Sequence, residues 1–488
     1  MEKKPTAPSA SLLDPKDWGA FRREAHALLD QSIDRLEHAG DGPVWQPLPE
    51  AARQRLSIPS PLGPTPVESL RAEVVESILP YATGNTHPRF WGWVHGTGTA
   101  GAMLAEMAAA GVNANCGGRN HGAIELERIV VGWACSWFGM PQNAGGLLVS
   151  GSSMANLYGI AMARHHKAGH DVRAKGLAGA TLAAYTSAEA HMSVTKAMEL
   201  LGLGRDALRA IPTDARLSMD LSALRSAVSA DRAAGLKPIC VIASAGTVNS
   251  GAFDDLNALA DYCADEGLWL HVDGAFGAMV VLNPTLAHLG KGIGRADSIA
   301  FDYHKWLHVP YDAGCVLVRD AALQIAAFGG RPDYLAAIGG LASGEPWPSD
   351  MGIELSRGFR ALKVWWTLRE HGTARLGESI ARNCGQAKLL EGLLTKRSRV
   401  AVAAPVTLNI VCCRYLAPGF GDAALDDLNA RIVVAIQESG VAVPSSCRIG
   451  GRLCIRICIT NHRSRDEDFA IMADAIESTG ARIAQSMA

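Results

Sequence analysis

The sequence has 488 residues, which is too long for one compact core and long enough for a large catalytic domain with smaller appendages. Hydrophobic residues make up 48% and charged residues 19%, a composition typical of folded globular proteins and not of disordered chains. The 46 Lys and Arg residues nearly balance the 48 Asp and Glu residues, leaving a net charge of −2. This balance gives no support for a nucleic acid or an anionic membrane as a partner.

Targeting and redox features of the sequence favour a cytoplasmic protein. The N-terminal residues carry charges and prolines but lack the apolar stretch of a secretory signal. We expect no membrane span, because no uninterrupted apolar run is long enough to cross a bilayer. The eleven cysteines form no CxxC pair and no Cys/His set at zinc-ligand spacing. We therefore predict reduced thiols in the core and no metal site.

Three parts follow one another along the chain. Residues 1–85 are predicted to contain a helix within 11–40 and then, because seven prolines lie between residues 42 and 66, an extended arm without regular structure. Such an arm needs a surface to lie on, for example that of a second subunit. Residues 86–375 are predicted to form a large domain, and residues 376–488 a small C-terminal α+β domain.

Short apolar runs that alternate with helical patterns define the large domain. Strands are expected over residues 147–150, 182–185, 239–243, 268–272, 298–301 and 315–318. This alternation predicts an α/β fold with a mostly parallel sheet, covered by helices on both faces and binding its ligand at the carboxyl ends of the strands. The Gly-rich residues 321–352 are predicted to be a mobile loop, followed by a helix near 355–370 that ends at Gly372.

A lysine at the end of a predicted buried strand is the first candidate for chemistry. Lys305 lies in the segment Asp-Tyr-His-Lys-Trp of residues 302–306, directly after the strand expected over 298–301. A buried amine is costly unless it is used or neutralised, and a Schiff base with a carbonyl cofactor would do both. A single lysine here more often extends to solvent, so the assignment depends on the other segments.

Two further segments could hold such a cofactor. The segment His-Val-Asp-Gly-Ala of residues 271–275 ends a strand with a carboxylate that can pair with a protonated pyridine nitrogen. The segment Gly-Ser-Ser-Met-Ala-Asn of residues 151–156 joins a strand to a helix, where backbone N–H groups and hydroxyls suit a phosphate. Alone, each segment could equally be a turn or a helix cap. Neither a GxGxxG nor a GxxxxGK[ST] pattern occurs at that turn, which argues against a dinucleotide.

A histidine follows a third strand, in the segment Glu-Ala-His-Met-Ser of residues 189–193. The imidazole of His191 could stack on a cofactor ring and donate or relay a proton. Because the chain has 15 histidines, a structural role is an open alternative for His191 and for His304 beside Lys305.

Together these segments resemble the family of pyridoxal-phosphate decarboxylases that includes aromatic L-amino-acid decarboxylase and glutamate decarboxylase. The resemblance extends from about residue 87 to 363, and Ser-Ala-Gly-Thr at residues 244–247 also occurs in the family's order. It implies a fold-type I enzyme with a mostly parallel seven-stranded sheet, an N-terminal arm and a small C-terminal domain. It also implies pyridoxal 5′-phosphate as cofactor and a homodimer.

The resemblance assigns roles by position. Lys305 becomes the Schiff-base lysine, Asp273 the partner of the pyridine nitrogen and His191 the ring-stacking residue. The other cofactor contacts that we predict are Ser152, Ser153, Met154, Thr247, Ala275 and His304. Tyr334, 29 residues after Lys305, matches the family's tyrosine that returns a proton to the substrate. Relatives that make aldehydes replace this tyrosine or the histidine, so retention of both favours an amine product.

Two departures from the family pattern leave questions open. Many relatives carry Asn where this chain has Asp302, and because a carboxylate cannot donate to a phosphate, we expect Asp302 to orient His304 or Lys305 instead.

The substrate wall is expected over residues 87–97, where Trp91 and Trp93 suit an aromatic side chain and His95 suits a polar or acidic one. The alternative for both tryptophans is an ordinary place in the core. We predict decarboxylation of an L-amino acid, with an aromatic substrate ahead of an acidic one. An aldehyde-forming enzyme or a carbon–carbon lyase on the same scaffold is the alternative.

Overall fold

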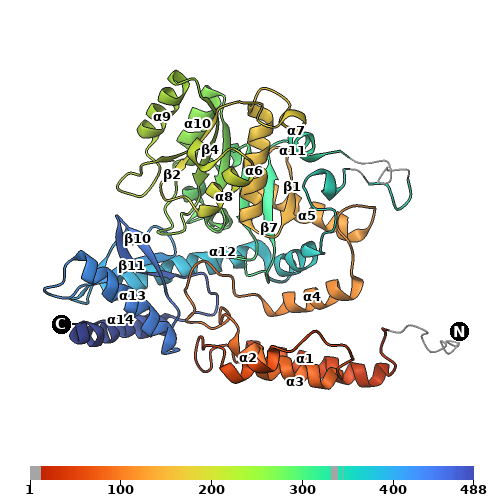
Figure 1. The fold of residues 1–488 in the computed structure, drawn as a ribbon, viewed down its shortest axis with the longest axis vertical. Helices are drawn as coiled ribbons and strands as arrows, with labels where there is room; N and C mark the ends of the chain where they lie inside the picture. The colour runs from red at the N-terminus through yellow and green to blue at the C-terminus, as the bar shows by residue number, and fades with distance from the viewer. Residues whose placement is uncertain (1–12, 331–338, 345, 488) are drawn as a thin grey trace.

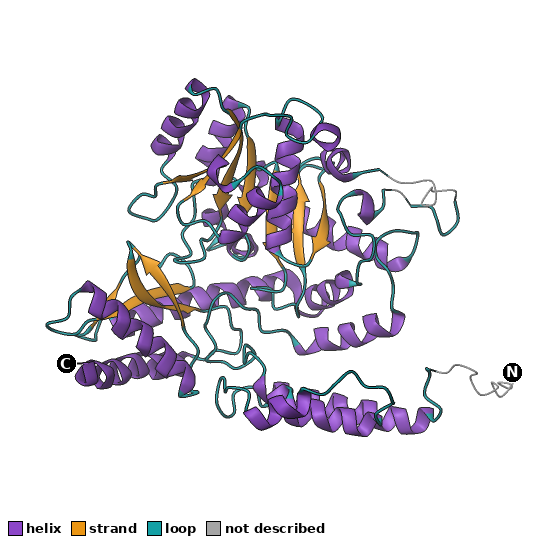
Figure 2. Cartoon of the chain, in the orientation of Figure 1, coloured by secondary structure: helices purple, strands orange, loops and turns teal. Residues whose placement is uncertain are grey.

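The computed structural model of the protein describes residues 13–330, 339–344 and 346–487 (Figure 1). A helical arm, a large α/β domain and a small α+β domain follow one another along the chain (Figure 2). Within these residues, no helix is long and apolar enough to cross a lipid bilayer.

The arm is built from three helices, α1 (Trp18–Glu37), α2 (Glu50–Leu56) and α3 (Val67–Ser77). The helix expected within residues 11–40 is α1, and the carboxylate of Asp17 caps it by accepting the backbone N–H groups of Gly19 and Ala20. The expectation that residues 42–66 lack regular structure is wrong for α2. Pro49 lies immediately before this helix, where a missing N–H group breaks no helical hydrogen bond.

A twisted sheet forms the centre of the large domain. Its strands are β1 (Gly145–Val149), β2 (Leu182–Ser187), β3 (Leu208–Ile211), β4 (Lys237–Ser244), β5 (Trp269–Asp273), β6 (Ser298–Asp302) and β7 (Gly314–Val318). The described residues give seven strands in the order β1-β7-β6-β5-β4-β2-β3, and among them only β7 runs antiparallel to its neighbours. This confirms the predicted α/β class and the mostly parallel sheet.

Helices cover both faces of this sheet, as Figure 2 shows. The helices of the large domain are α4 (Ala100–Val112), α5 (Gly122–Trp137), α6 (Ser152–Lys167), α7 (Val172–Lys175), α8 (Met192–Leu200), α9 (Leu221–Ala233), α10 (Leu256–Glu266) and α11 (Ala321–Phe328). Side chains alternate along β4, so that Val241 belongs to the apolar cluster on the α9 and α10 face of the sheet and Ile242 to the cluster on the α6 face. The first residues of the Gly-rich segment 321–352 form α11, which corrects the prediction of a loop there.

The long helix α12 (Arg360–Leu394) connects the two domains. The first helical segment ends at Gly372, as predicted. Gly372 has a φ of 71° and kinks the helix, but the apolar side chains of Leu376 and Ile380 continue into the same core, so a second helical segment follows. The domain boundary predicted between residues 375 and 376 falls inside this helix.

The small domain is an antiparallel sheet with two helices packed against it. It contains β8 (Val400–Val402), β9 (Ile410–Tyr415), α13 (Asp422–Glu438), β10 (Ser445–Ile449), β11 (Arg452–Cys458) and α14 (Asp466–Met487). The described strands lie in the order β10-β11-β9-β8. An earlier segment joins this domain, because Phe90 forms a β-bridge with Val443.

Candidate active site

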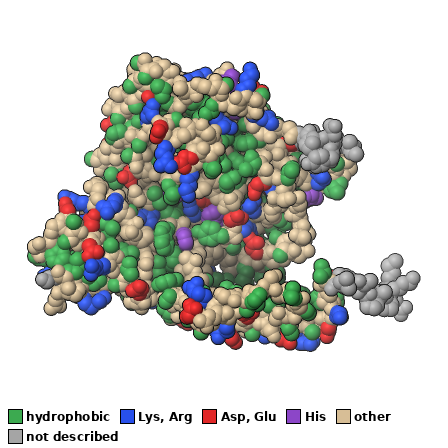
Figure 3. Space-filling view, in the orientation of Figure 1, with side chains coloured by type: hydrophobic (Ala, Val, Ile, Leu, Met, Phe, Trp, Pro, Cys, Tyr) green, Lys and Arg blue, Asp and Glu red, His purple; other side chains and the backbone are tan. Residues whose placement is uncertain are grey.

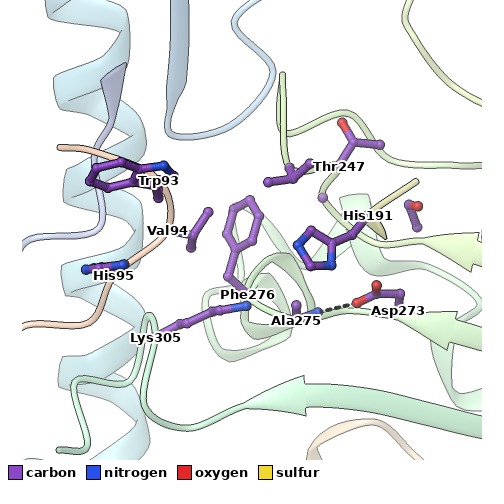
Figure 4. A pocket seen from close by; sticks show the side chains of 12 residues that line it. Trp93, Val94, His95, His191, Thr247, Asp273, Ala275, Phe276 and Lys305 are labelled. Atoms are coloured by element: carbon purple, nitrogen blue, oxygen red, sulfur yellow. Dashed lines mark hydrogen bonds between the residues drawn. The ribbon is translucent and has the colours of Figure 1, made fainter. Parts of the chain in front are cut away.

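The carboxyl ends of β4, β5 and β6 meet at two adjoining cavities of about 310 and 370 Å³. Both cavities are lined by His191, Asp273, Ala275 and Lys305, which come from three different segments. Figure 4 shows these side chains around a common space with Trp93, His95 and Phe276. The strand ends that the sequence singled out therefore come together, as expected for an open α/β sheet.

Lys305 forms an ion pair inside this site. Its Nζ lies 2.9 Å from Oδ2 of Asp302, the last residue of β6. Burial disfavours the charged ammonium, but the Asp302 carboxylate outweighs burial and raises the pKa of Lys305 above its ordinary value. The amine is thus held in place and protonated.

Asp302 interacts with Lys305 more closely than with His304, whose Nε2 is 3.7 Å from the carboxylate. His304 instead accepts the backbone N–H of Ala313 at Nδ1, at 2.9 Å, and packs against the ring of Tyr311. The other carboxylate oxygen, Oδ1, is buried and has no hydrogen-bond partner among the described residues. Asp302 therefore sits in the position expected of a residue that orients Lys305.

The turn before α6 forms the floor of the second cavity, where Ser152, Ser153 and Met154 lie. Ser152 begins the helix, and its Oγ is buried without a hydrogen-bond partner in the part of the chain that the structure describes. A Cβ atom at Gly314 would lie 2.4 Å from Cα of Gly151, so only glycine allows the two segments to approach this closely. An unpaired hydroxyl beside free helical N–H groups is suited to an anion.

Asp273 and His191 line both cavities and lie near each other in Figure 4. Asp273 accepts the backbone N–H of Ala275 at Oδ1, at 3.1 Å, and the Nδ2 of Asn156 at Oδ2, at 2.8 Å. His191 caps α8, and its Nδ1 accepts the backbone N–H of Ser193 at 3.2 Å. Burial lowers the pKa of His191, and the Asp273 carboxylate only partly offsets this effect. The neutral ring consequently carries its proton on Nε2.

The loop after β4 closes the first cavity with Gly246 and Thr247. The Thr247 Oγ1 accepts the backbone N–H of Ala252 at 3.1 Å and lies 3.0 Å from the Ser250 Oγ, which fixes the loop. Phe276 and Tyr311 also line the site, although the sequence analysis did not select them. Phe276 could have been found from its place beside the Asp-Gly-Ala segment, whereas no sequence signal marks Tyr311.

The two tryptophans of the predicted substrate wall have different surroundings. Trp93 is 53% exposed and lines the first cavity beside His95, with ring centroids 5.9 Å apart. Trp91 is 1% exposed, donates its Nε1–H to the Ser464 Oγ at 3.0 Å and stacks on Phe469 in the core of the small domain. The prediction that Trp91 contacts the substrate is therefore corrected: it is a core residue.

The side chains that line the first cavity carry few charges. Burial, aided by the nearby Lys305 and His304, lowers the pKa of His95, so this ring is neutral near pH 7. Among the described residues that line the cavity, Lys305 is the only Lys or Arg side chain. The remaining predicted site residue, Tyr334, lies outside the described residues.

Comparisons with known proteins identify the family. A model of the pyridoxal-dependent decarboxylase conserved domain matches residues 49–416. The aromatic-L-amino-acid decarboxylase of Bacillus atrophaeus is 34% identical over 452 residues, which cover 92% of this chain and 93% of that protein. This chain belongs to the pyridoxal-dependent decarboxylase family.

Other members of this family support the same fold. The phenylacetaldehyde synthase of Petunia hybrida is 29% identical to this decarboxylase, and the alignment covers 92% of both chains. The crystal structure of Oryza sativa TDC with PLP and tryptamine superposes with a TM-score of 0.88 at 27% identity, covering 96% of this chain and 99% of that one. The fold and the cofactor that the sequence predicted are confirmed.

The site of the decarboxylase fits pyridoxal 5′-phosphate. The free hydroxyl of Ser152 and the close packing of Gly151 against Gly314 offer a place for the phosphate. Asp273 would hold the pyridine nitrogen, Lys305 the reactive carbonyl carbon and His191 one face of the ring. Tyr311 lines the phosphate end and adds a hydroxyl that the sequence analysis missed.

The pair of Asp302 and Lys305 leads to a testable pH dependence. Only the neutral amine can attack the carbonyl carbon, so the raised pKa of Lys305 makes cofactor attachment faster as the pH rises towards that pKa. In Asp302→Asn the carboxylate is lost and the pKa of Lys305 falls. We expect the rise in attachment rate to shift to lower pH by about one to three units.

The measurement is the rate at which the visible absorbance of the bound cofactor appears after mixing with the apoprotein, over a series of pH values. Pyridoxal, which lacks the phosphate, serves as the control, because its attachment should shift in the same way. Identical profiles for the wild-type and Asp302→Asn proteins would contradict the role of Asp302.

Proposed function

We propose that this decarboxylase removes the carboxylate of an aromatic L-amino acid and releases the corresponding amine. The observation that carries the choice of substrate is the lining of the first cavity. Trp93, Val94, Val248 and Phe276 are apolar, and the neutral His95 offers no charge to balance a second carboxylate. An aromatic side chain gains from such surroundings, whereas an acidic one would lose its hydration without an ionic partner.

The chain's own residues would divide the work as follows. Bound pyridoxal 5′-phosphate supplies a ring that accepts the electron pair of the Cα–carboxylate bond. Asp273 would offer its carboxylate to the protonated ring nitrogen, and the turn at Ser152 and Ser153 would hold the phosphate. Lys305 would hold the cofactor through its amine.

Proton return to Cα would come from Tyr334 or from His191. The roles of both rest on the family resemblance, and for His191 also on the geometry that leaves its Nε2–H free to face the cavities. A proton delivered to Cα gives the amine as product. Because both residues are present, the amine is favoured over an aldehyde.

A substrate panel tests this proposal. Purified protein loaded with cofactor is given L-tryptophan, L-tyrosine, L-phenylalanine and L-glutamate, and carbon dioxide, amine and aldehyde are followed in parallel. We expect carbon dioxide and amine in equal amounts from at least one aromatic amino acid. Release from L-glutamate alone would overturn the aromatic assignment, and no release from any amino acid would overturn the decarboxylase assignment.

An aldehyde-forming enzyme is the second candidate, favoured by the similarity to the phenylacetaldehyde synthase of Petunia hybrida. Aldehyde, ammonia and peroxide in place of the amine would establish it in the same assay. A carbon–carbon lyase on this scaffold would instead cleave a side-chain bond and leave the carboxylate in place.

A homodimer is part of the proposal. Large apolar side chains of the arm are exposed, among them Trp18 at 56% and Leu70 at 46%. Figure 3 shows apolar side chains on the surface of the arm, along the lower edge of the view. Helix α1 contains no buried residue among those described. A second subunit would cover this surface. We expect light scattering to give twice the mass of the chain, and a fully active monomer would contradict this.

We also propose that the enzyme works in the cytoplasm. All eleven cysteines lie in the described part of the chain, and none of them forms a disulfide. Proteins of reducing compartments keep such thiols free. Fractionation of the source cells, with the protein followed by an antibody, would test the location.

A further inference from the structure

A chain of buried hydrogen bonds runs along the face of β5 that α6 covers. Trp269, His271 and Asp273 alternate along this strand and therefore point to the same side. Ser298 of β6 lies between the first two side chains, and Asn156 of α6 lies between the last two. Each contact in the chain is between 2.8 and 3.0 Å long.

The chemistry of the two ends forces the direction of this chain. An indole N–H can only donate, and the Trp269 Nε1–H reaches the Ser298 Oγ at 2.8 Å. An ionised carboxylate can only accept, and Oδ2 of Asp273 lies 2.8 Å from the Nδ2 of Asn156. Between the ends, the Ser298 hydroxyl must donate to Nδ1 of His271, and Nε2–H of His271 must donate to Oδ1 of Asn156.

His271 is suited to this relay because it is neutral. Its ring is fully buried, and burial lowers the pKa of His271 to about 3. A neutral imidazole has one donor and one acceptor, which is what the chain requires at this point. The ring also fits tightly, since a Cβ atom at Gly159 of α6 would lie 2.3 Å from its Nδ1.

The chain branches at Asn156 and reaches a second site residue. The same Nδ2 group donates to the Ser193 Oγ at 2.9 Å, and the Ser193 hydroxyl lies 2.8 Å from Nδ1 of His191. Because the Ser193 oxygen accepts from Asn156, its O–H is directed to His191. The backbone N–H of Ser193 donates to the same Nδ1, so both contacts keep the His191 proton on Nε2.

We infer that Asn156, oriented by His271 and Ser298, is a positioning residue that serves Asp273 and His191 together. One amide group holds the Asp273 carboxylate in the orientation that aims it at the pyridine nitrogen and, through Ser193, directs the Nε2–H of His191 towards the cavities. The inference rests on the proposed roles of Asp273 and His191. Neither Asn156 nor His271 touches the cavities, so both act through the two residues that do.

The test measures the dissociation constant of pyridoxal 5′-phosphate and the absorbance maximum of the bound cofactor. Asn156→Asp keeps the shape of the side chain but replaces the donor with an acceptor, and we expect affinity to fall by about 10- to 100-fold. Ser298→Ala removes the hydrogen bond to Nδ1 of His271, and we expect cofactor affinity to fall by roughly 3- to 10-fold. In both variants the absorbance maximum should shift, because the ring nitrogen is less firmly held protonated.

Matched variants separate this effect from a loss of packing. His271→Gln retains a donor and an acceptor and is expected to bind the cofactor better than His271→Leu, which has neither. Ser193→Ala breaks the branch to His191 but keeps the contact of Asn156 with Asp273, so it should lower kcat more strongly than it lowers cofactor affinity. Thr186→Val removes a buried hydroxyl of β2 that donates to the carbonyl of Ile242. This control should change neither the cofactor affinity nor the absorbance maximum of the bound cofactor.

The outcomes distinguish this inference from the assignment of the site. If Asp273→Asn loses affinity while Asn156→Asp and Ser298→Ala bind like the wild type, the positioning role is wrong and the site stands. If Asp273→Asn itself binds like the wild type, the assignment of Asp273 is wrong. Equal losses in Thr186→Val and Ser298→Ala would mean a general loss of packing and would also overturn the inference. If Asn156→Asp does not fold, the cofactor affinity of Ser298→Ala decides whether the positioning role is correct.

Discussion

Replacement of Lys305 by alanine is expected to lower kcat by on the order of 10⁴-fold and to abolish covalent attachment of the cofactor. Lys305 is the one cation among the described residues that line both cavities, and Asp302 holds its Nζ at 2.9 Å. Without this amine, the cofactor has no covalent link to the chain. The substrate amine would then have to react with a cofactor whose carbonyl carbon no lysine holds in place.

Reduction with borohydride provides the measurement, because it traps the link between lysine and cofactor permanently, and the labelled peptide can then be identified by mass spectrometry. The control is Lys363→Met, since Lys363 is also buried but pairs with Glu106 of α4 and lines neither cavity. We expect label at Lys305 in the wild type and in the control and none in Lys305→Ala. Label on another lysine of the wild type would refute the assignment.

The sequence was sufficient for the parts of the fold that obey a simple periodicity. The strand before Lys305 is a buried apolar run, and it appears as β6. The strand β3 was missed because, of its four residues, Ile211 alone is fully buried and an arginine interrupts the run. The continuation of α12 beyond Gly372 was missed because glycine usually ends a helix, and only packing against the core shows that it resumes.

The predicted cofactor residues Lys305, Asp273 and His191 share one property: each lies at the carboxyl end of a strand or within a few residues after it. Lys305, Asp273 and His191 could therefore be placed together from the rule that parallel strands end at one edge. Trp91 and Trp93 could not be told apart, because the partner of Trp91 is Ser464, 373 residues away. Asn156 was likewise seen only as part of the phosphate turn, since its contact with Asp273 joins α6 to β5.

A second large effect is expected from Glu127→Gln, which should reduce the free energy of unfolding by about 3–5 kcal/mol. Glu127 and Arg357 form a buried two-pronged ion pair, with contacts of 2.6 and 3.0 Å, and their side chains are almost wholly inaccessible. The amide of glutamine has the same shape but no charge. The buried Arg357 guanidinium would then lack the carboxylate of Glu127, and this uncompensated buried charge accounts for the loss of stability.

This ion pair also protects an edge of the sheet next to the phosphate turn. Strand β1 is at the end of the sheet order, and the backbone N–H of Leu148 donates to Glu127 at 3.0 Å while its carbonyl accepts from Arg357 at 2.5 Å. The pair thus satisfies backbone groups that a neighbouring strand would otherwise bind. Because β1 leads directly to Gly151 and Ser152, we expect Glu127→Gln to weaken cofactor affinity as well.

Urea denaturation of the apoprotein measures the loss of stability without a contribution from bound cofactor. The matched control is Glu125→Gln, two residues earlier on α5, whose pair with Arg128 is exposed and should contribute less than about 1 kcal/mol. The double variant Glu127→Leu with Arg357→Leu removes both charges but leaves the backbone N–H and carbonyl of Leu148 without partners, so it should recover only the part of the lost stability that is due to the unpaired charge. If Glu127→Gln and Glu125→Gln lose the same small amount, the ion pair does not hold β1 in place.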